Sequence, residues 1–217
     1  MAMMTLRRVV VALGLVLGLS LLPAAGRAAD VDLGRATVQG AVNEGISTFV
    51  GTRHPLAERS RLLDDLLRRY IDPSMLSAGI LGRYWGKISP AEQSAFSELF
   101  VRYLVTSYVG ILGRAEPGTS VKVTGGDDLG SKVRVRSSAL LPSQPGDPIP
   151  VEWEVATTAD GRPVIMDLTA QGVSLIRAMK DDSASVLRSS GGKIDPLMEA
   201  LRRKIEYNEK ANAAQAG

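Results

Sequence analysis

Few residues of this chain could carry chemistry, because it contains a single histidine, His54, and no cysteine. The absence of cysteine excludes a thiolate nucleophile, and one histidine is too few for a zinc site built from histidine and cysteine. A nucleophilic triad could use only His54, which precedes Pro55 in a short segment between two predicted helices. That position favours a role at the surface or at a helix end over catalysis.

Paired carboxylates are the other candidates for acid–base chemistry. Adjacent pairs occur at 64–65, 127–128 and 181–182. Neighbours on a helix do not share a face, so we interpret these pairs as solvated surface. Asp167 lies in a predicted strand, where a structural role such as capping the following turn is favoured. Gly125–Gly126 is not followed by the helix start that a phosphate-binding loop requires. We therefore predict no catalytic residue and no metal site, and a protein that binds something rather than transforming it.

Residues 1–28 have the features of a secretory signal peptide. Arg7 and Arg8 precede an apolar run from Val9 to Leu22, and small residues then lead to a predicted cleavage site after Ala28. The apolar run has 14 residues, whereas a membrane-spanning helix needs about 20. We expect export to the periplasm, where a chain without cysteine must be held together by packing alone.

Removal of this leader leaves 189 residues, enough for one domain with one substantial core. We predict a single domain at 29–207 and a disordered tail at 208–217, where the residues are small and polar. Three of the 26 basic residues lie in the leader, so the mature chain has 23 basic and 23 acidic residues. This balance does not predict a nucleic-acid partner.

A long helix from Pro90 to Leu112 is expected to organise the fold. Ser89 and Glu92 have the spacing of a capping box, which marks the helix start. Apolar residues cover more than half of its circumference, so it must be buried on several sides. Two interpretations remain open: a central core helix, or a helix whose one side lines an apolar ligand cavity.

The remaining elements are predicted from the spacing at which apolar residues recur along the chain. Helices are expected at 30–50, 57–70 and 74–81, and two more close the chain after residue 174. Between them the period changes to two, which predicts four strands joined by short links as an antiparallel meander. Pairing of the second and third strands places Arg134 opposite Glu154 and Arg136 opposite Glu152.

The predicted fold class is α+β, with helices packed on one face of a curved four-stranded antiparallel sheet and an apolar cavity between them. A diacyl lipid of roughly 30 methylenes gains on the order of 25 kcal/mol when its chains leave water for such a cavity. The alternatives are an interaction or scaffold domain with a filled core and, less favoured, a hydrolase. The inward-facing residues predicted to line the cavity are Leu76, Ile80, Leu81, Phe100, Leu104, Val105, Tyr108, Val133, Val135, Val151, Trp153, Val155, Met166, Leu168 and Val173.

Two blocks of residues resemble a known family. The first is Leu81-Gly82-Arg83-Tyr84-Trp85 followed by Ser89-Pro90-Ala91-Glu92-Gln93, and the second is Asp167 followed by Gly172-Val173-Ser174-Leu175. Their order and spacing resemble the periplasmic phospholipid-binding component of the Mla system, also called the toluene-tolerance family, over about residues 35–206. The chain departs from the family at Lys180 and Ser183, where Arg and Phe are usual.

The resemblance implies a soluble carrier that holds phospholipid tails between helices and a twisted sheet, with the headgroup outside and no cofactor besides this cargo. It implies two membrane partners, an inner-membrane ABC transporter complex with an MCE-domain subunit and an outer-membrane lipoprotein complex, together with transient membrane contact. The implied role is maintenance of outer-membrane lipid asymmetry. A related branch is linked to hopanoid biosynthesis, so a hopanoid or another lipid is an alternative cargo.

Overall fold

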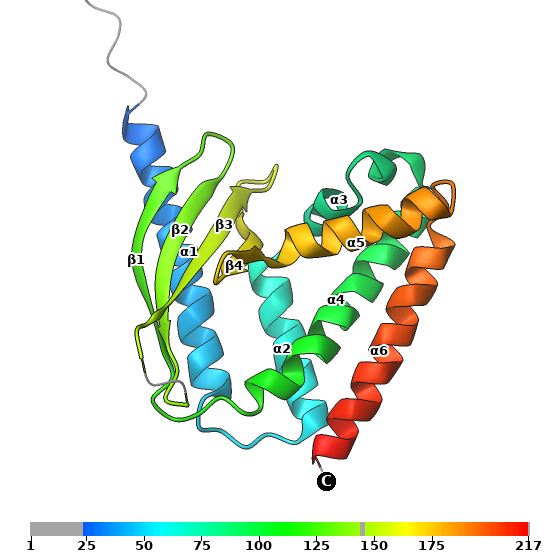
Figure 1. Ribbon diagram of the computed structural model, residues 1–217. Helices are drawn as coiled ribbons and strands as arrows, with labels where there is room; N and C mark the ends of the chain where they lie inside the picture. The colour runs from blue at the N-terminus through cyan, green and yellow to red at the C-terminus, as the bar shows by residue number, and fades with distance from the viewer. Residues whose placement is uncertain (1–23, 144–145, 217) are drawn as a thin grey trace, which may run out of the picture.

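The computed structural model describes residues 24–143 and 146–216. The predicted leader lies mostly outside this part of the chain, and its last five residues, 24–28, begin the first helix. The elements in chain order (Figure 1) are α1 (Ala24–Phe49), α2 (Leu56–Tyr70), α3 (Pro73–Leu81), the 3-10 helix η1 (Gly82–Lys87), α4 (Pro90–Leu112), β1 (Ser120–Asp128), β2 (Val133–Leu140), β3 (Ile149–Thr157), β4 (Pro163–Ala170), β5 (Val173–Ser174), α5 (Leu175–Ser189) and α6 (Asp195–Ala216).

The predicted α+β class is confirmed. The strands form one antiparallel sheet in the order β1-β2-β3-β4-β5, beside a layer of helices (Figure 1). The sheet has one strand more than the four that the sequence predicts. Gln171 and Gly172 both have positive φ, 51° and 79°, and this tight reversal lets Val173–Ser174 pair with the end of β4.

The first strand is longer than its apolar alternation predicts. The glycines and aspartates at 125–130 are typical of a turn, but β1 continues to Asp128. A bulge between Val123 and Gly125 changes the register against β2, and glycine tolerates the local distortion. A Cβ atom at Gly126 would lie 3.0 Å from Val31 of α1, so this glycine also lets the helix approach the sheet.

The predicted pairing of β2 with β3 is confirmed. Arg134 is opposite Glu154, and Arg136 is opposite Glu152. The ion pairs are mostly diagonal, with Arg134 Nε 3.6 Å from Glu152 Oε2 and Lys132 Nζ 2.6 Å from Glu154 Oε2. These side chains are partly exposed, so they orient the sheet and contribute little stability.

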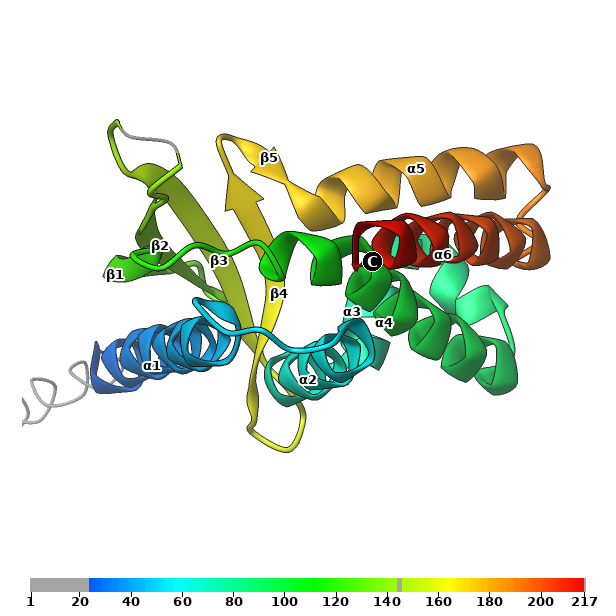
Figure 2. The same cartoon turned by 90° about the horizontal axis from the view of Figure 1, so that it is seen from below.

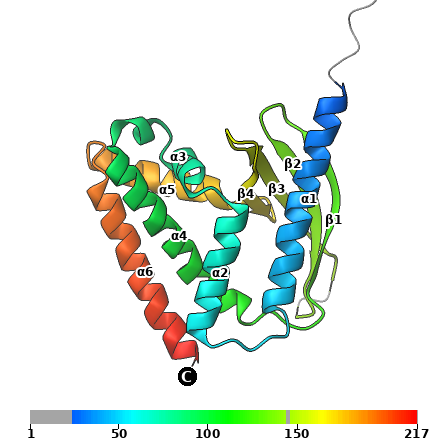
Figure 3. The same ribbon diagram turned by 180° about the vertical axis from the view of Figure 1, so that it is seen from behind.

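One helix covers part of the sheet by itself. α1 lies along the strands (Figure 3), and its Val38 and Val42 form a small core with the sheet residues Val133, Val135 and Val155. The approach is close, because a Cβ atom at Gly34 would lie 2.9 Å from Val133 Cγ1.

The second and larger core surrounds α4, as predicted for the central helix. Ser89 and Glu92 form the predicted capping box. The core residues of α4, Phe96 and Phe100 among them, are buried against apolar residues of α2, α3, α5 and α6. α4 is long and apolar enough to cross a membrane by length and composition. Its contacts with the neighbouring helices are those of a core helix.

The last helix extends through the segment for which a disordered tail is predicted. α6 continues to Ala216 and runs beside α4 (Figures 1 and 3). Asn208 Nδ2 donates to Ser107 Oγ at 3.1 Å, and Asn212 Nδ2 donates to the carbonyl of Thr106 at 2.7 Å. The small, polar composition suggested disorder, but these polar groups find partners on α4 and order the helix.

Candidate functional site

A cavity of about 680 Å³ lies between the two cores. One wall comes from α1 and α2, and another from the C-terminal half of α4 and the connection to β1. The sheet and the start of α5 complete it through residues of β1, β3, β4 and β5. Seen from below (Figure 2), the sheet lies to the left and α4 and α6 lie to the right. Residues far apart in the sequence therefore meet at one site.

The cavity wall is almost entirely hydrocarbon. Its polar side chains are Tyr70, Tyr108, Thr119, Trp153 and Asp167, among 28 lining residues. The Tyr70 hydroxyl donates to Glu44 Oε2 at 3.2 Å, and Trp153 Nε1 donates to Ser137 Oγ at 2.8 Å. These two groups are already satisfied within the protein.

Asp167 has the structural role that its position in the sequence favours. Its Oδ1 accepts from the backbone N–H of Leu168 at 2.8 Å and of Ile176 at 3.0 Å, and its Oδ2 accepts from Ser174 Oγ at 2.5 Å. Ser174 in turn accepts from the N–H of Arg177 at the start of α5. The carboxylate thus joins β4 to the N-terminus of α5, where a negative charge is favourable.

The cavity reaches the surface at apolar residues. Ile111 of α4 and Val173 of β5 both line it, and they are 57% and 66% exposed. Leu104, two turns before the end of α4, lines the same cavity and is 5% exposed. Exposure therefore rises along this helix toward the rim.

Seven of the predicted lining residues do line the cavity: Leu76, Leu104, Tyr108, Trp153, Met166, Leu168 and Val173. Their contact with a lipid stays a prediction.

The other eight predicted lining residues lie elsewhere. Ile80, Leu81 and Phe100 are buried in the helical core. Val133, Val135 and Val155 lie beneath α1. Their alternation in the sequence predicts that this face of the sheet is covered, and α1 is the cover. Val105 belongs to the helical core and borders a shallow surface groove beside Arg68 and Glu98, and Val151 is buried within β3.

The residues that sequence reasoning missed come mainly from the first two helices. Val42, Ile46 and Phe49 of α1 and Leu63, Leu66 and Leu67 of α2 line the cavity. The apolar stripe of α2 was a usable signal, because an amphipathic helix must bury that face somewhere. Periodicity did not indicate that the stripe faces the sheet side of the fold.

The residues at which the chain departs from the usual family pattern, Lys180 and Ser183, are on α5. Ser183 is buried, and the Lys180 side chain passes near Gly82, with its Cε 3.8 Å from where a Cβ atom would stand. Neither is among the residues that line the cavity. Lys180 therefore lies where α5 passes the junction of α3 and η1.

The candidates for chemistry are dispersed in the described part of the chain. His54 Nε2 lies 3.2 Å from the carbonyl of Thr48 near the end of α1, and its Nδ1 lies 3.6 Å from Glu58 Oε1. Asp64 and Asp65 pair with arginines one turn away on α2. Within residues 24–143 and 146–216, no group of three or more histidines and carboxylates could hold a metal ion.

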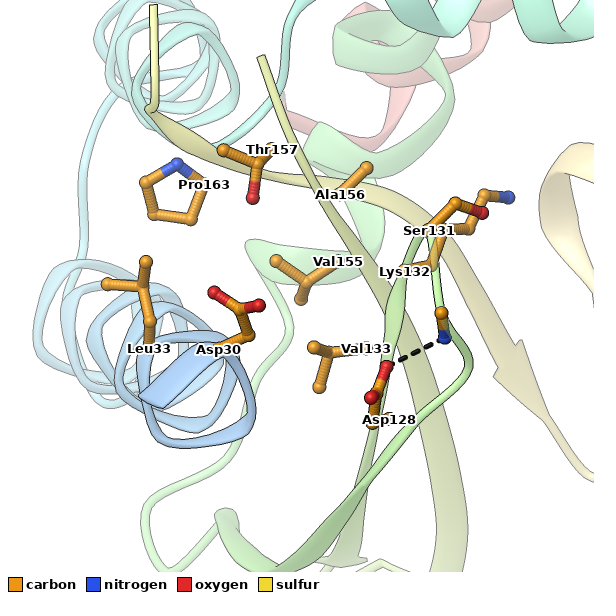
Figure 4. Close-up of a pocket in the computed structure, with 12 residues that line it drawn as sticks. Asp30, Leu33, Asp128, Ser131, Lys132, Val133, Val155, Ala156, Thr157 and Pro163 are labelled. Atoms are coloured by element: carbon orange, nitrogen blue, oxygen red, sulfur yellow. Dashed lines mark hydrogen bonds between the residues drawn. The ribbon is translucent and has the colours of Figure 1, made fainter. Parts of the chain in front are cut away.

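A second recess lies at the other end of the sheet, between α1 and the β1–β2 turn (Figure 4). Its volume is about 50 Å³, which is space for a few waters at most. Asp128 Oδ1 accepts from the N–H of Gly130 at 2.7 Å there and closes the turn. We interpret this recess as a feature of the turn.

The fold and the cavity define an α+β protein with a binding site for an apolar ligand. A family model described as MlaC protein matches residues 42–203, which is most of the chain. The chain therefore belongs to the MlaC family.

A solved structure is also similar to this chain. It is the phospholipid-binding protein from Ralstonia solanacearum, solved in complex with a phospholipid. The two chains are 22% identical, with a TM-score of 0.71, and the alignment covers 81% of this chain and 98% of the other. The similarity confirms the fold.

Proposed function

We propose that this protein is a periplasmic phospholipid carrier that moves lipid between the outer and inner membranes and thereby maintains outer-membrane lipid asymmetry. The observation that carries the proposal is the cavity of about 680 Å³ with its hydrocarbon wall. Membership of the MlaC family and the phospholipid complex of the similar Ralstonia protein support it.

The cavity volume suits an acyl chain. A methylene group occupies about 30 Å³, close to the volume that one molecule occupies in liquid water. The cavity therefore has room for roughly 20 methylenes. Their transfer from water to an apolar site contributes about 16 kcal/mol at about 0.8 kcal/mol each. Transfer from a bilayer gains far less, because the chains are already in hydrocarbon. A carrier of this kind exchanges lipid with membranes and shields the tails while it crosses water.

The rim suggests how the lipid lies. Ile111 and Val173 are exposed beside the opening, so the tails enter the cavity and the headgroup remains in water. We propose the membrane partners implied by the family: an inner-membrane ABC transporter complex with an MCE-domain subunit, an outer-membrane lipoprotein complex, and transient contact with each membrane. The bound lipid is cargo, and no catalytic role is assigned to the protein.

Lipid analysis of protein purified from the periplasm tests the proposal. We expect organic extraction and mass spectrometry to find a phospholipid at close to one molecule per protein, and the mature chain to begin at Ala29. A hopanoid in the same spectrum would replace the phospholipid as cargo. Protein that is empty and also takes no lipid from vesicles would overturn the carrier function in favour of a scaffold.

A further inference from the structure

The polar groups of the cavity are not all satisfied within the protein. Tyr70, Trp153 and Asp167 have the partners described above. Among the described residues, the side-chain hydroxyls of Tyr108 and Thr119 have no hydrogen-bond partner, although both residues line the cavity. Thr119 is flanked by the exposed residues Gly118 and Ser120, where water is at hand. Tyr108 is partly buried as well, but it lies on the face of α4 that lines the cavity.

Tyr108 lies between the interior and the opening. It is one helical turn after the buried Leu104 and three residues before the exposed Ile111, and all three line the cavity. Residues at these spacings share one face of a helix. Tyr108 is partly buried, so along the helix it stands between the part of the cavity that would hold a tail and the rim where the polar end of the lipid would lie.

Burial raises the pKa of the Tyr108 hydroxyl above its usual value, which is about 10 for tyrosine. The hydroxyl therefore stays protonated at neutral pH and remains a hydrogen-bond donor. An ester carbonyl, at the head of an acyl chain, is an acceptor without a charge. When lipid displaces water from the cavity, such a carbonyl gives the hydroxyl an acceptor in place of water, and a donor left without one would be unfavourable.

We propose that Tyr108 is a specificity-determining residue whose hydroxyl donates a hydrogen bond to an ester carbonyl of the bound lipid and so sets how deeply the acyl chain enters. This inference rests on the proposed lipid-carrier function. It predicts that the site distinguishes ester-linked from ether-linked chains of equal length, because the ether lacks the carbonyl acceptor.

A competition experiment tests this prediction. The protein is incubated with vesicles that contain equal amounts of dipalmitoyl phosphatidylglycerol and its dihexadecyl ether analogue, and the two lipids on the re-isolated protein are counted by mass spectrometry. We expect the wild type to enrich the ester lipid by roughly two- to tenfold, the effect of one neutral hydrogen bond. Tyr108→Phe should bring the ratio close to one. The ratio does not depend on how much of the variant is folded.

Tyr103→Phe is the matched control, because it removes the hydroxyl of another tyrosine of α4, one that packs against the helical core and is not among the residues that line the cavity. It should keep the wild-type ratio. A wild-type ratio of one, or an ester preference that survives Tyr108→Phe, would overturn the role of Tyr108 while leaving the carrier function intact. A wild type that takes up neither lipid would overturn the carrier function itself.

Discussion

Leu104 is the residue at which a larger side chain would fill the cavity most directly. It lies on the cavity side of α4 and is 5% exposed. Val151 is buried to a similar extent, 8% exposed, but is not among the lining residues. The two positions therefore separate the effect of filling a void from the effect of overpacking a core.

We predict that Leu104→Trp lowers the lipid that co-purifies by about half or more, because each displaced methylene removes about 0.8 kcal/mol of burial. Its unfolding midpoint in urea should stay near that of the wild type. Val151→Trp should instead lose about 1–3 kcal/mol of stability through strain. Wild-type lipid content in Leu104→Trp would exclude this part of the cavity as a lipid site.

A second prediction at the residue scale concerns Asp167, whose three hydrogen bonds join β4 to α5. Asp167→Ala should lower the free energy of unfolding by about 1–3 kcal/mol, because it removes a helix cap and leaves partly buried donors unpaired. Asp182→Ala, at an exposed position of the same helix, is the control. Equal urea midpoints for the two variants would show that Asp167 is not a stabilising cap.

At the scale of elements, glycines decide how closely the helices approach their neighbours. Gly34 lets α1 lie against Val133 of the sheet, whereas Gly79 of α3 has no heavy atom within 4 Å of a Cβ position. Both glycines are inside helices, so replacement by alanine brings the same gain in helix propensity. Only the packing differs.

Gly79→Ala should therefore raise the free energy of unfolding by about 0.5–1 kcal/mol. Gly34→Ala should lower it, because a Cβ atom 2.9 Å from Val133 Cγ1 forces α1 away from the sheet at a cost of about 1–3 kcal/mol. Thermal unfolding of the two variants checks the opposite signs. A stabilised Gly34→Ala would mean that α1 is not held this tightly.

The end of α6 gives a third test at this scale. A chain that stops at Tyr207 loses the hydrogen bonds of Asn208 and Asn212 and the ion pair of Glu209 with Arg102. It should be less stable by about 1–4 kcal/mol, because two hydrogen bonds contribute about 0.5–1.5 kcal/mol each and an exposed ion pair contributes about 0–1 kcal/mol. A chain lacking only residues 216–217 keeps these contacts. Equal stability of the two truncations would restore the prediction of a disordered tail.

At the scale of the whole molecule, two cores meet across a space that the protein leaves open. One core joins α1 to the sheet, the other surrounds α4, and the cavity takes its walls from both. Protein interiors are otherwise close-packed. A ligand that fills this space binds only the folded state and therefore stabilises it by mass action.

The fluorescence of the two tryptophans can show whether a ligand occupies the cavity. Trp153 lines the cavity, whereas Trp85 lies in η1 against the helical core. Removal of lipid should move the tryptophan emission to longer wavelength, because water enters around Trp153. Trp85→Phe should keep the change, and Trp153→Phe should abolish it. A change that persists without Trp153 would place the ligand elsewhere.

Local features of the sequence determined most of the elements. The capping box at Ser89 marks the start of α4, and alternation with charge pairing predicts the register of Arg134 against Glu154. The signals for these features lie within a few residues, or in a two-residue period, so they do not depend on the rest of the fold. The seven predicted residues that line the cavity follow from the same logic, since periodicity identifies the side that faces inward.

Only the tertiary structure decided what each inward face meets. Val135 and Trp153 both belong to strands with an apolar face, but Val135 is covered by α1 and Trp153 borders the cavity. The difference depends on a helix about a hundred residues away in sequence, which approaches the sheet at Gly34 and leaves the rest of that face uncovered. Regularly spaced apolar residues form a surface that must be removed from water. A helix or a lipid can cover that surface equally well.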